Sequence, residues 1–96
     1  MPHYVTLIKW TDQGIRNVKE SPKRAEAARK LAEAEGGKLT LYYTMGRYDI
    51  VGIAEARDDE MMNRILLRIA TQGNVRTETL KATSEADAAK MIGKLP

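Results

Sequence analysis

Four short segments of the chain alternate apolar and polar residues, the period-two pattern that predicts β-strands. They are residues 3–10, 38–44, 49–56 and 75–83. Each contains several β-branched or aromatic residues, which strands favour. The first segment is apolar on both sides, with Val5 and Leu7 on one side and Tyr4, Ile8 and Trp10 on the other. We therefore expect a sheet that is apolar on both faces.

The segments between the strands carry apolar residues at intervals of three and four, which is typical of helices. A first helix is predicted from Ser21 to about Glu35, with Ser21 as its N-cap, Pro22 at its first position and Gly36-Gly37 at its end. Its apolar face consists of Ala25, Ala28, Leu31 and Ala32. Such small residues predict close packing of the helix on the sheet. Residues 11–17 are predicted to form a loop.

A second helix is predicted to begin at Asp58 and to end at Gly73. Its acidic first turn, Asp58-Asp59-Glu60, is better explained by capping and by the helix dipole than by a metal or acid-base site. Its apolar stripe consists of Met62, Ile65, Leu66, Ile69 and Ala70. A short last helix begins at Ser84, and its stripe consists of Ala88, Met91, Ile92 and Leu95.

The order βαββαβ plus a C-terminal helix predicts one α+β domain over residues 1–96. The expected architecture is ferredoxin-like, a four-stranded antiparallel sheet with the helices on one face. The other face is then apolar and uncovered, which is the mark of an interface. We expect a homodimer, or a higher oligomer, in which two sheets pack face to face. The alternative is a monomer whose last helix folds across the open face.

Composition excludes several kinds of site. The chain has no cysteine and a single histidine, His3, so it cannot form disulfides, thiolate metal sites or multi-histidine sites within one chain. We predict no metal and no cofactor. No apolar run approaches the roughly 20 residues that span a membrane, and no signal peptide precedes the first strand. We therefore expect a soluble, cytoplasmic protein with no membrane partner.

The charge pattern argues against nucleic-acid binding. The net charge is +3, from 16 basic and 13 acidic residues, and both signs are interspersed along the chain. The densest basic stretch, residues 19–30, is diluted by Glu20 and Glu26 and fits a solvated helix face. The third strand, residues 49–56, has no aromatic residue on which an RNA-recognition motif would stack bases. No nucleic-acid partner is predicted.

The segment Met45-Gly46-Arg47-Tyr48-Asp49 contains an arginine, a tyrosine and an aspartate, which a turn alone does not need. Gly46 supplies backbone freedom, and the Arg47 guanidinium can clamp a carboxylate or phosphate. In a purely structural interpretation, Asp49 holds the turn and Tyr48 packs on a neighbour. In a functional one, the segment borders a ligand cleft at one end of the sheet. The predicted ligand-binding residues are Tyr42, Arg47, Tyr48, Asp49 and Arg76. Arg76 has a second interpretation, an internal ion pair with Glu78.

Several runs of residues give the chain a family resemblance. Gly46-Arg47-Tyr48-Asp49 entering an apolar strand, and Gly73-Asn74-Val75-Arg76-Thr77 at the fourth strand, resemble the GYD domain family. Gly14-Ile15-Arg16-Asn17 and Ser21-Pro22 are similar to it as well. The resemblance covers roughly residues 4–83. It implies a ferredoxin-like subunit of the dimeric α/β-barrel type, in a family whose biochemical role is unassigned.

The function expected from the residues and the resemblance is that of a small oligomeric binding or regulatory module, with a cleft for a small anionic or aromatic ligand. The alternative is a cofactor-free monooxygenase-type enzyme of the dimeric α/β-barrel group. The pocket of such an enzyme would draw on Trp10, Tyr42, Tyr43 and Tyr48. A third option is a structural subunit whose activity lies in a partner. Whether the protein is an enzyme stays open at this point.

Overall fold

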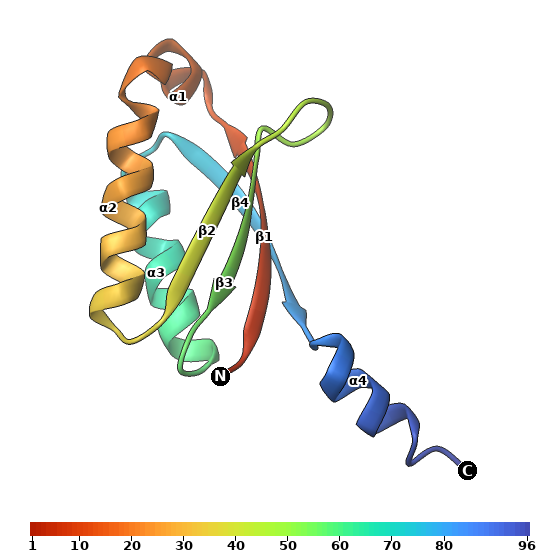
Figure 1. Cartoon of the computed structure of the whole chain (residues 1–96). Helices are drawn as coiled ribbons and strands as arrows, with labels where there is room; N and C mark the ends of the chain where they lie inside the picture. The colour runs from red at the N-terminus through yellow and green to blue at the C-terminus, as the bar shows by residue number, and fades with distance from the viewer.

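A four-stranded antiparallel sheet forms the centre of the protein, and two long helices cover one of its faces (Figure 1). The computed structural model describes residues 1–96. Its elements are β1 (His3–Trp10), α1 (Asp12–Arg16), η1 (Val18–Glu20), α2 (Ser21–Ala34), β2 (Lys38–Tyr43), β3 (Ile50–Glu55), α3 (Asp59–Thr71), β4 (Val75–Ala82) and α4 (Glu85–Ile92). The α+β class and the antiparallel sheet are confirmed, with strand boundaries within one residue of those predicted.

The strand order is β2-β3-β1-β4, so β1 lies inside the sheet between β3 and β4. The register places Ile8 opposite Ile50 on one side and opposite Thr77 on the other. Because side chains alternate along a strand, this register gives each face a fixed set of residues. The helix-covered face contributes Tyr4, Thr6, Ile8, Ile50, Ala54 and Val75 to the buried interior.

Helix α3 supplies most of the buried helical side chains. Met61, Met62 and Ile65 are buried against the sheet and α2. The helix begins at Asp58, whose carboxylate accepts a hydrogen bond from the Met61 amide at 2.8 Å, as the N-cap prediction requires. Ser84 caps α4 in the same way, accepting from the Asp87 amide at 3.1 Å.

The predicted loop at residues 11–17 is wrong, since Asp12–Arg16 form helix α1. The 3₁₀ turn η1 follows directly after this segment. Thr11 is the N-cap, and its hydroxyl oxygen accepts from the Gly14 amide at 3.1 Å. The same hydroxyl donates to the Gly73 carbonyl at 2.6 Å. A five-residue helix has little stability of its own. Its position beside the start of β4 therefore depends on contacts that lie far away in sequence.

Ser21 does not cap α2, contrary to the sequence prediction. It is buried, makes no capping hydrogen bond, and shares a hydrogen bond of 2.8 Å with the Tyr43 hydroxyl. The residue before the helix is Glu20, and Pro22 lies in the first turn as expected. The Ser21 hydroxyl thus joins the start of α2 to the end of β2.

Helix α4 projects away from the rest of the molecule and leaves the second face of the sheet uncovered (Figure 1). It contains no buried residue, and the predicted stripe residues Met91, Ile92 and Leu95 are all exposed. The monomer in which the last helix folds across the open face is therefore not the arrangement observed. No helix in the protein has the length and apolar character needed to cross a lipid bilayer.

Candidate functional site

The turn between β2 and β3 holds the Met45–Asp49 segment in a closed loop. The Thr44 amide donates to the Asp49 carbonyl at 2.9 Å, and the Thr44 hydroxyl donates to the Tyr48 carbonyl at 2.7 Å. Gly46 has a φ of 108°, a backbone angle that residues with a Cβ rarely adopt. Glycine is thus needed at this position for backbone reasons alone.

Asp49 makes contacts that belong to the sheet. Its carboxylate Oδ2 accepts from the Trp10 amide at 2.9 Å, and its own amide donates to the Ile8 carbonyl at 2.9 Å. These two bonds join the turn to the end of β1. The geometry gives Asp49 a structural duty, while a role in ligand binding stays a prediction.

Tyr48 lies on the open face of the sheet among charged side chains. Its ring has Lys9 Nζ at 5.8 Å and Arg47 Cζ at 5.7 Å from the centroid. Its hydroxyl donates to Glu78 Oε1 at 3.2 Å. Cations over an exposed aromatic ring contribute about 0.5–1 kcal/mol each. Tyr48 thereby links the turn to both β1 and β4.

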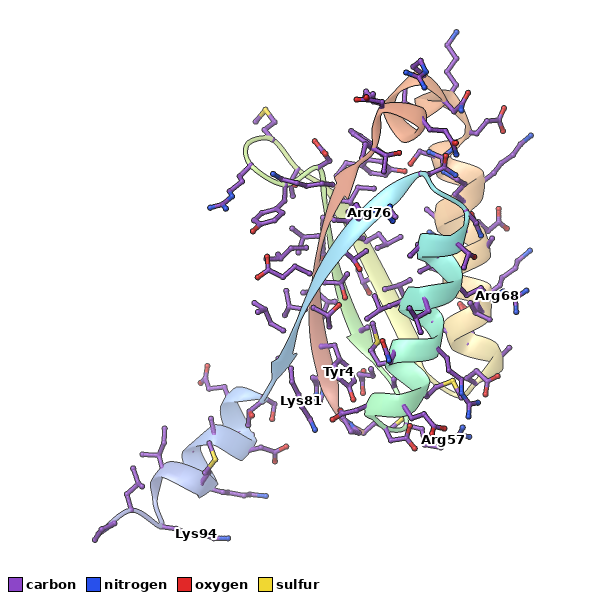
Figure 2. The ribbon with its side chains drawn as sticks, turned by 180° about the vertical axis from the view of Figure 1, so that it is seen from behind. Tyr4, Arg57, Arg68, Arg76, Lys81 and Lys94 are labelled. Atoms are coloured by element: carbon purple, nitrogen blue, oxygen red, sulfur yellow. The ribbon has the colours of Figure 1, made fainter.

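Arg76 and Tyr42 lie on the same face. Arg76 is directly opposite Lys9 in the register, and Tyr42 is opposite Val51. Figure 2 shows Arg76 near the start of β4, at the end opposite Lys81. The predicted ion pair of Arg76 with Glu78 is wrong, because no such contact exists within 4.0 Å. The Glu78 carboxylate instead accepts a hydrogen bond from the Tyr48 hydroxyl at 3.2 Å.

These side chains form one surface, which we call the hairpin patch. It consists of Lys9, Tyr42, Arg47, Tyr48, Arg76 and Glu78. Four of the five predicted ligand-binding residues belong to it, and Asp49 lies beside it. The patch carries three cations and one carboxylate, and none of the cations is in an ion pair. Its excess positive charge favours an anionic group.

The middle of the open face is apolar. The cross-strand pairs of Val5 with Ile53 and Leu80, and of Leu7 with Val51, bring five aliphatic side chains together. Ile53 is 43% exposed and Leu80 is 49% exposed. The prediction that both faces of the sheet are apolar is thus confirmed.

A second polar group lies at the other end of the sheet, where β1 begins and β4 ends (Figure 2). The Tyr4 hydroxyl donates to Asp59 Oδ1 at 2.5 Å, and Lys81 Nζ lies 3.1 Å from the same oxygen. Burial, followed by the hydrogen bond to Asp59, raises the pKa of Tyr4 to about 12. The hydrogen bonds from Tyr4 and Lys81 lower the pKa of Asp59. Tyr4 therefore stays a neutral donor at physiological pH and ties β1 to the start of α3.

Sequence reasoning missed this group because its members are 22 and 55 residues apart. A tyrosine on the apolar face of a strand was the available signal. Its hydroxyl needs a partner when the ring is buried. No three His, Cys, Asp or Glu side chains gather anywhere in the protein in a way that could hold a metal ion.

A cavity of about 190 Å³, partly open to solvent, lies between the helices and the covered face of the sheet. It is lined by Ala25, Ala27, Ala28 and Leu31 of α2, by Leu39 and Leu41 of β2, and by Met62, Ile65, Leu66 and Ile69 of α3, among others. The predicted close packing of α2 on the sheet is confirmed at Ala32, which is buried in a cluster against which Leu39 of β2 packs. It is wrong at Ala25 and Ala28, where the cavity lies beside the helix.

Part of the polar lining of this cavity lies where β1 ends and α2 begins. Trp10, Ser21 and Arg24 line it there. Both Trp10 Nε1 and Arg24 Nη2 are buried without a hydrogen-bond partner. Of the aromatic residues suggested for a pocket, Trp10 lines the cavity. The centroid of the Tyr43 ring lies 6.3 Å from that of the Trp10 ring. Tyr42 and Tyr48 are on the opposite face of the sheet.

Comparisons with known proteins agree with this architecture. A model of the GYD domain matches residues 4–92. A relative from Thermus thermophilus, named "Glutamine synthetase and cystathionine beta-lyase binding protein", is 33% identical over 89 residues, which are 91% of this chain and 94% of the relative. The crystal structure of TTHA0845 from the same organism has a TM-score of 0.57 at 23% identity, covering 88% of this chain and 95% of the other, and shows a shared fold. The resemblance carried by Gly46–Asp49 and Gly73–Thr77 is confirmed, and the chain belongs to the GYD domain family.

Proposed function

We propose that this GYD domain is a single-domain, homodimeric binding module that acts on other proteins. In this proposal the subunit is ferredoxin-like, since its βαββαβ order and its strand order are those of that arrangement. Two subunits join through the open faces of their sheets. The observation that carries the proposal is the exposed aliphatic surface in the middle of that face, around Ile53 and Leu80.

Burial of this surface gives a physical reason for dimerisation. Monomers rarely expose a contiguous apolar sheet face, because its burial is favourable by about 25 cal/mol for each Å². A two-fold axis through the face brings the same residues of both copies together and closes the assembly. Helix α4 leaves the face free. An assembly of this kind is the dimeric α/β barrel that the sequence led us to expect.

The hairpin patch lies at one end of the open face, beyond the aliphatic centre. We propose it as the contact for an acidic group of a protein partner, with Arg47 and Arg76 as the main donors and Tyr42 and Tyr48 as aromatic contacts. Asp49 holds the turn that presents them. The relative's printed name, a binding protein for glutamine synthetase and cystathionine β-lyase, supports a protein-binding and regulatory role of this kind.

The dimer is tested by placing a charge in the aliphatic centre. The unmodified protein should have twice the chain mass of 10.8 kDa in size-exclusion chromatography with light scattering. Ile53→Glu should have the mass of one chain at micromolar concentration, because two carboxylates would be buried against each other. Leu67→Glu is the control, since Leu67 is exposed on α3, away from this face. A mass of one chain at all concentrations for the unmodified protein would refute the dimer.

The partner contact is tested with the glutamine synthetase and the cystathionine β-lyase of the organism that makes this chain. The double variant Arg47→Ala/Arg76→Ala should bind either enzyme roughly tenfold more weakly, since two exposed charge contacts contribute about 1–2 kcal/mol together. The measurement is biolayer interferometry at low and at physiological salt. Arg16→Ala/Arg29→Ala is the control, because it changes the net charge equally at exposed residues of α1 and α2. Equal losses in both double variants would contradict a specific patch.

A further inference from the structure

The cavity between α2, α3 and the sheet has walls that suit a hydrocarbon group. Its volume of about 190 Å³ exceeds the roughly 150 Å³ of an apolar protein cavity that admits a benzene molecule. Alanines at three positions of α2 supply this room, since leucine or methionine there would fill it. A six-membered ring or a chain of similar size therefore fits between α2, α3 and the sheet.

The charge of the lining has one sign. Among the residues around the cavity are two arginines, Arg24 and Arg68, and neither aspartate nor glutamate. Neither arginine takes part in an ion pair. A cavity with cations and no carboxylate selects an anion over a neutral molecule or a cation.

Only one of the two terminal nitrogens of the Arg24 guanidinium has a hydrogen-bond partner. Its Nη1 donates to the Asn17 carbonyl at 3.1 Å, which fixes the side chain against the segment between α1 and η1. Its Nη2 is buried and has no partner. A buried donor on a charged group is unfavourable until an acceptor reaches it. The site therefore lacks an acceptor at this nitrogen.

Trp10 offers a second donor at the same end of the cavity. Its indole Nε1 carries a hydrogen, cannot accept, and is buried without a partner. The Tyr43 hydroxyl forms a hydrogen bond with Ser21 and accepts from neither of the two buried donors. Two unpaired N–H donors, one of them charged, suit the two oxygens of a carboxylate.

We propose that this cavity binds a small carboxylic acid with an apolar ring or short chain, its carboxylate held by Arg24 and Trp10 and its hydrocarbon part lying among the leucines and alanines of the walls. The carboxylate supplies the acceptors that both buried donors lack. Neither nitrogen has surface open to the cavity in the free protein, so binding includes a small rotation of the Arg24 and Trp10 side chains. Inorganic phosphate fits less well, because it has no apolar part to lie against the hydrocarbon walls. This ligand site lies on the opposite side of the sheet from the hairpin patch and is independent of it.

The test is titration of the full-length protein with phenylacetate and hexanoate, followed by amide NMR shifts and calorimetry. Both acids should bind with a dissociation constant below about 1 mM, and the shifts should involve residues of α2, β1 and α3. Benzyl alcohol, which has no charge, should bind at least tenfold more weakly. Absence of binding by both acids at 10-fold higher concentration, on the order of 10 mM, would overturn the proposal, and so would equal binding of the alcohol.

Variants connect the binding to the named donors. Arg24→Gln should weaken phenylacetate binding at least tenfold, and Trp10→Phe about threefold or more, because each removes one donor while keeping much of the side chain. Ala28→Leu should abolish binding by filling the cavity, and Arg24→Gln decides the matter if that variant fails to fold. Arg29→Gln, on the exposed side of α2, is the matched control and should bind normally.

Arg47→Ala/Arg76→Ala should also bind phenylacetate normally, so failure here and failure of the protein-binding proposal remain distinguishable. Loss of binding in Arg29→Gln equal to that in Arg24→Gln would mean that the acid is attracted only by general positive charge. That result would overturn the proposal.

Discussion

Replacing Gly14 with alanine should destabilise the fold by about 3 kcal/mol. A Cβ at this position would overlap the backbone carbonyl oxygen of Asn74 and would lie 2.8 Å from its carbonyl carbon. The Asn74 carbonyl cannot move freely, because it accepts a hydrogen bond from the Thr11 amide at 3.0 Å. The contact joins α1 to the start of β4. The strain must therefore either break this junction or displace the whole helix.

Such a loss is large against the total of roughly 5–15 kcal/mol for a domain of this kind. We expect the melting temperature of Gly14→Ala to fall by roughly 10–20 °C, measured by circular dichroism, with a matching fall in the urea midpoint. Gly93→Ala is the control. Its Cβ would meet only the carbonyl oxygens of its own helix end, at 3.3 Å or more, and it should melt close to the unmodified protein. A Gly14→Ala variant with an unchanged urea midpoint would refute the close approach of α1 and β4.

Replacing Asp49 with alanine should cost about 2 kcal/mol of stability, which is typical for a hydrogen bond to a charged group. The variant loses the acceptor for the Trp10 amide and leaves that donor unpaired at the edge of the core. Asp49→Asn should lose less, because its amide oxygen still accepts. Urea unfolding of the three proteins measures the difference.

Arg47→Ala provides the contrast for Asp49. Arg47 is exposed and has no ion pair, so its removal should change stability by less than about 0.5 kcal/mol. Binding of the partner enzymes, measured on the same samples, should be weakened by the arginine change and kept by folded Asp49→Asn. An Asp49→Ala protein with full stability and lost binding would make Asp49 a binding residue instead. The Gly-Arg-Tyr-Asp run thus separates into residues that build the turn and residues presented by it.

The strands could be predicted from the sequence because their pattern is local. Alternation along β1 assigned Tyr4, Ile8 and Trp10 to one face, and the register confirms it. Helix α1 was missed because its N-cap, Thr11, also depends on the Gly73 carbonyl from the other half of the chain. The role of Ser21 was mistaken for a similar reason, since its partner Tyr43 arrives only with the fold.

The cavity illustrates a different limit of sequence reasoning. Alanines on one face of a helix indicate either a close approach or an empty space, and only the distance between backbones distinguishes the two. The alanine face of α2 favoured the first, and the structure has both, since Ala32 is packed closely while Ala25 and Ala28 border the cavity. Arg24 fitted a solvated helix face by its charge pattern, yet one of its nitrogens is buried. A long side chain can follow an apolar wall inward from an exposed position.

The stability of the projecting helix α4 should depend on whether another molecule packs against it. Isolated helices shorter than about 12–15 residues are barely stable in water, and α4 has 8 residues and no buried side chain. We therefore expect α4 to be stably helical in water only when Met91, Ile92 and Leu95 pack against another molecule. Amide exchange in this segment would then slow only on docking. Amide exchange in α4 would therefore show, without any attached label, whether another molecule is bound to this helix.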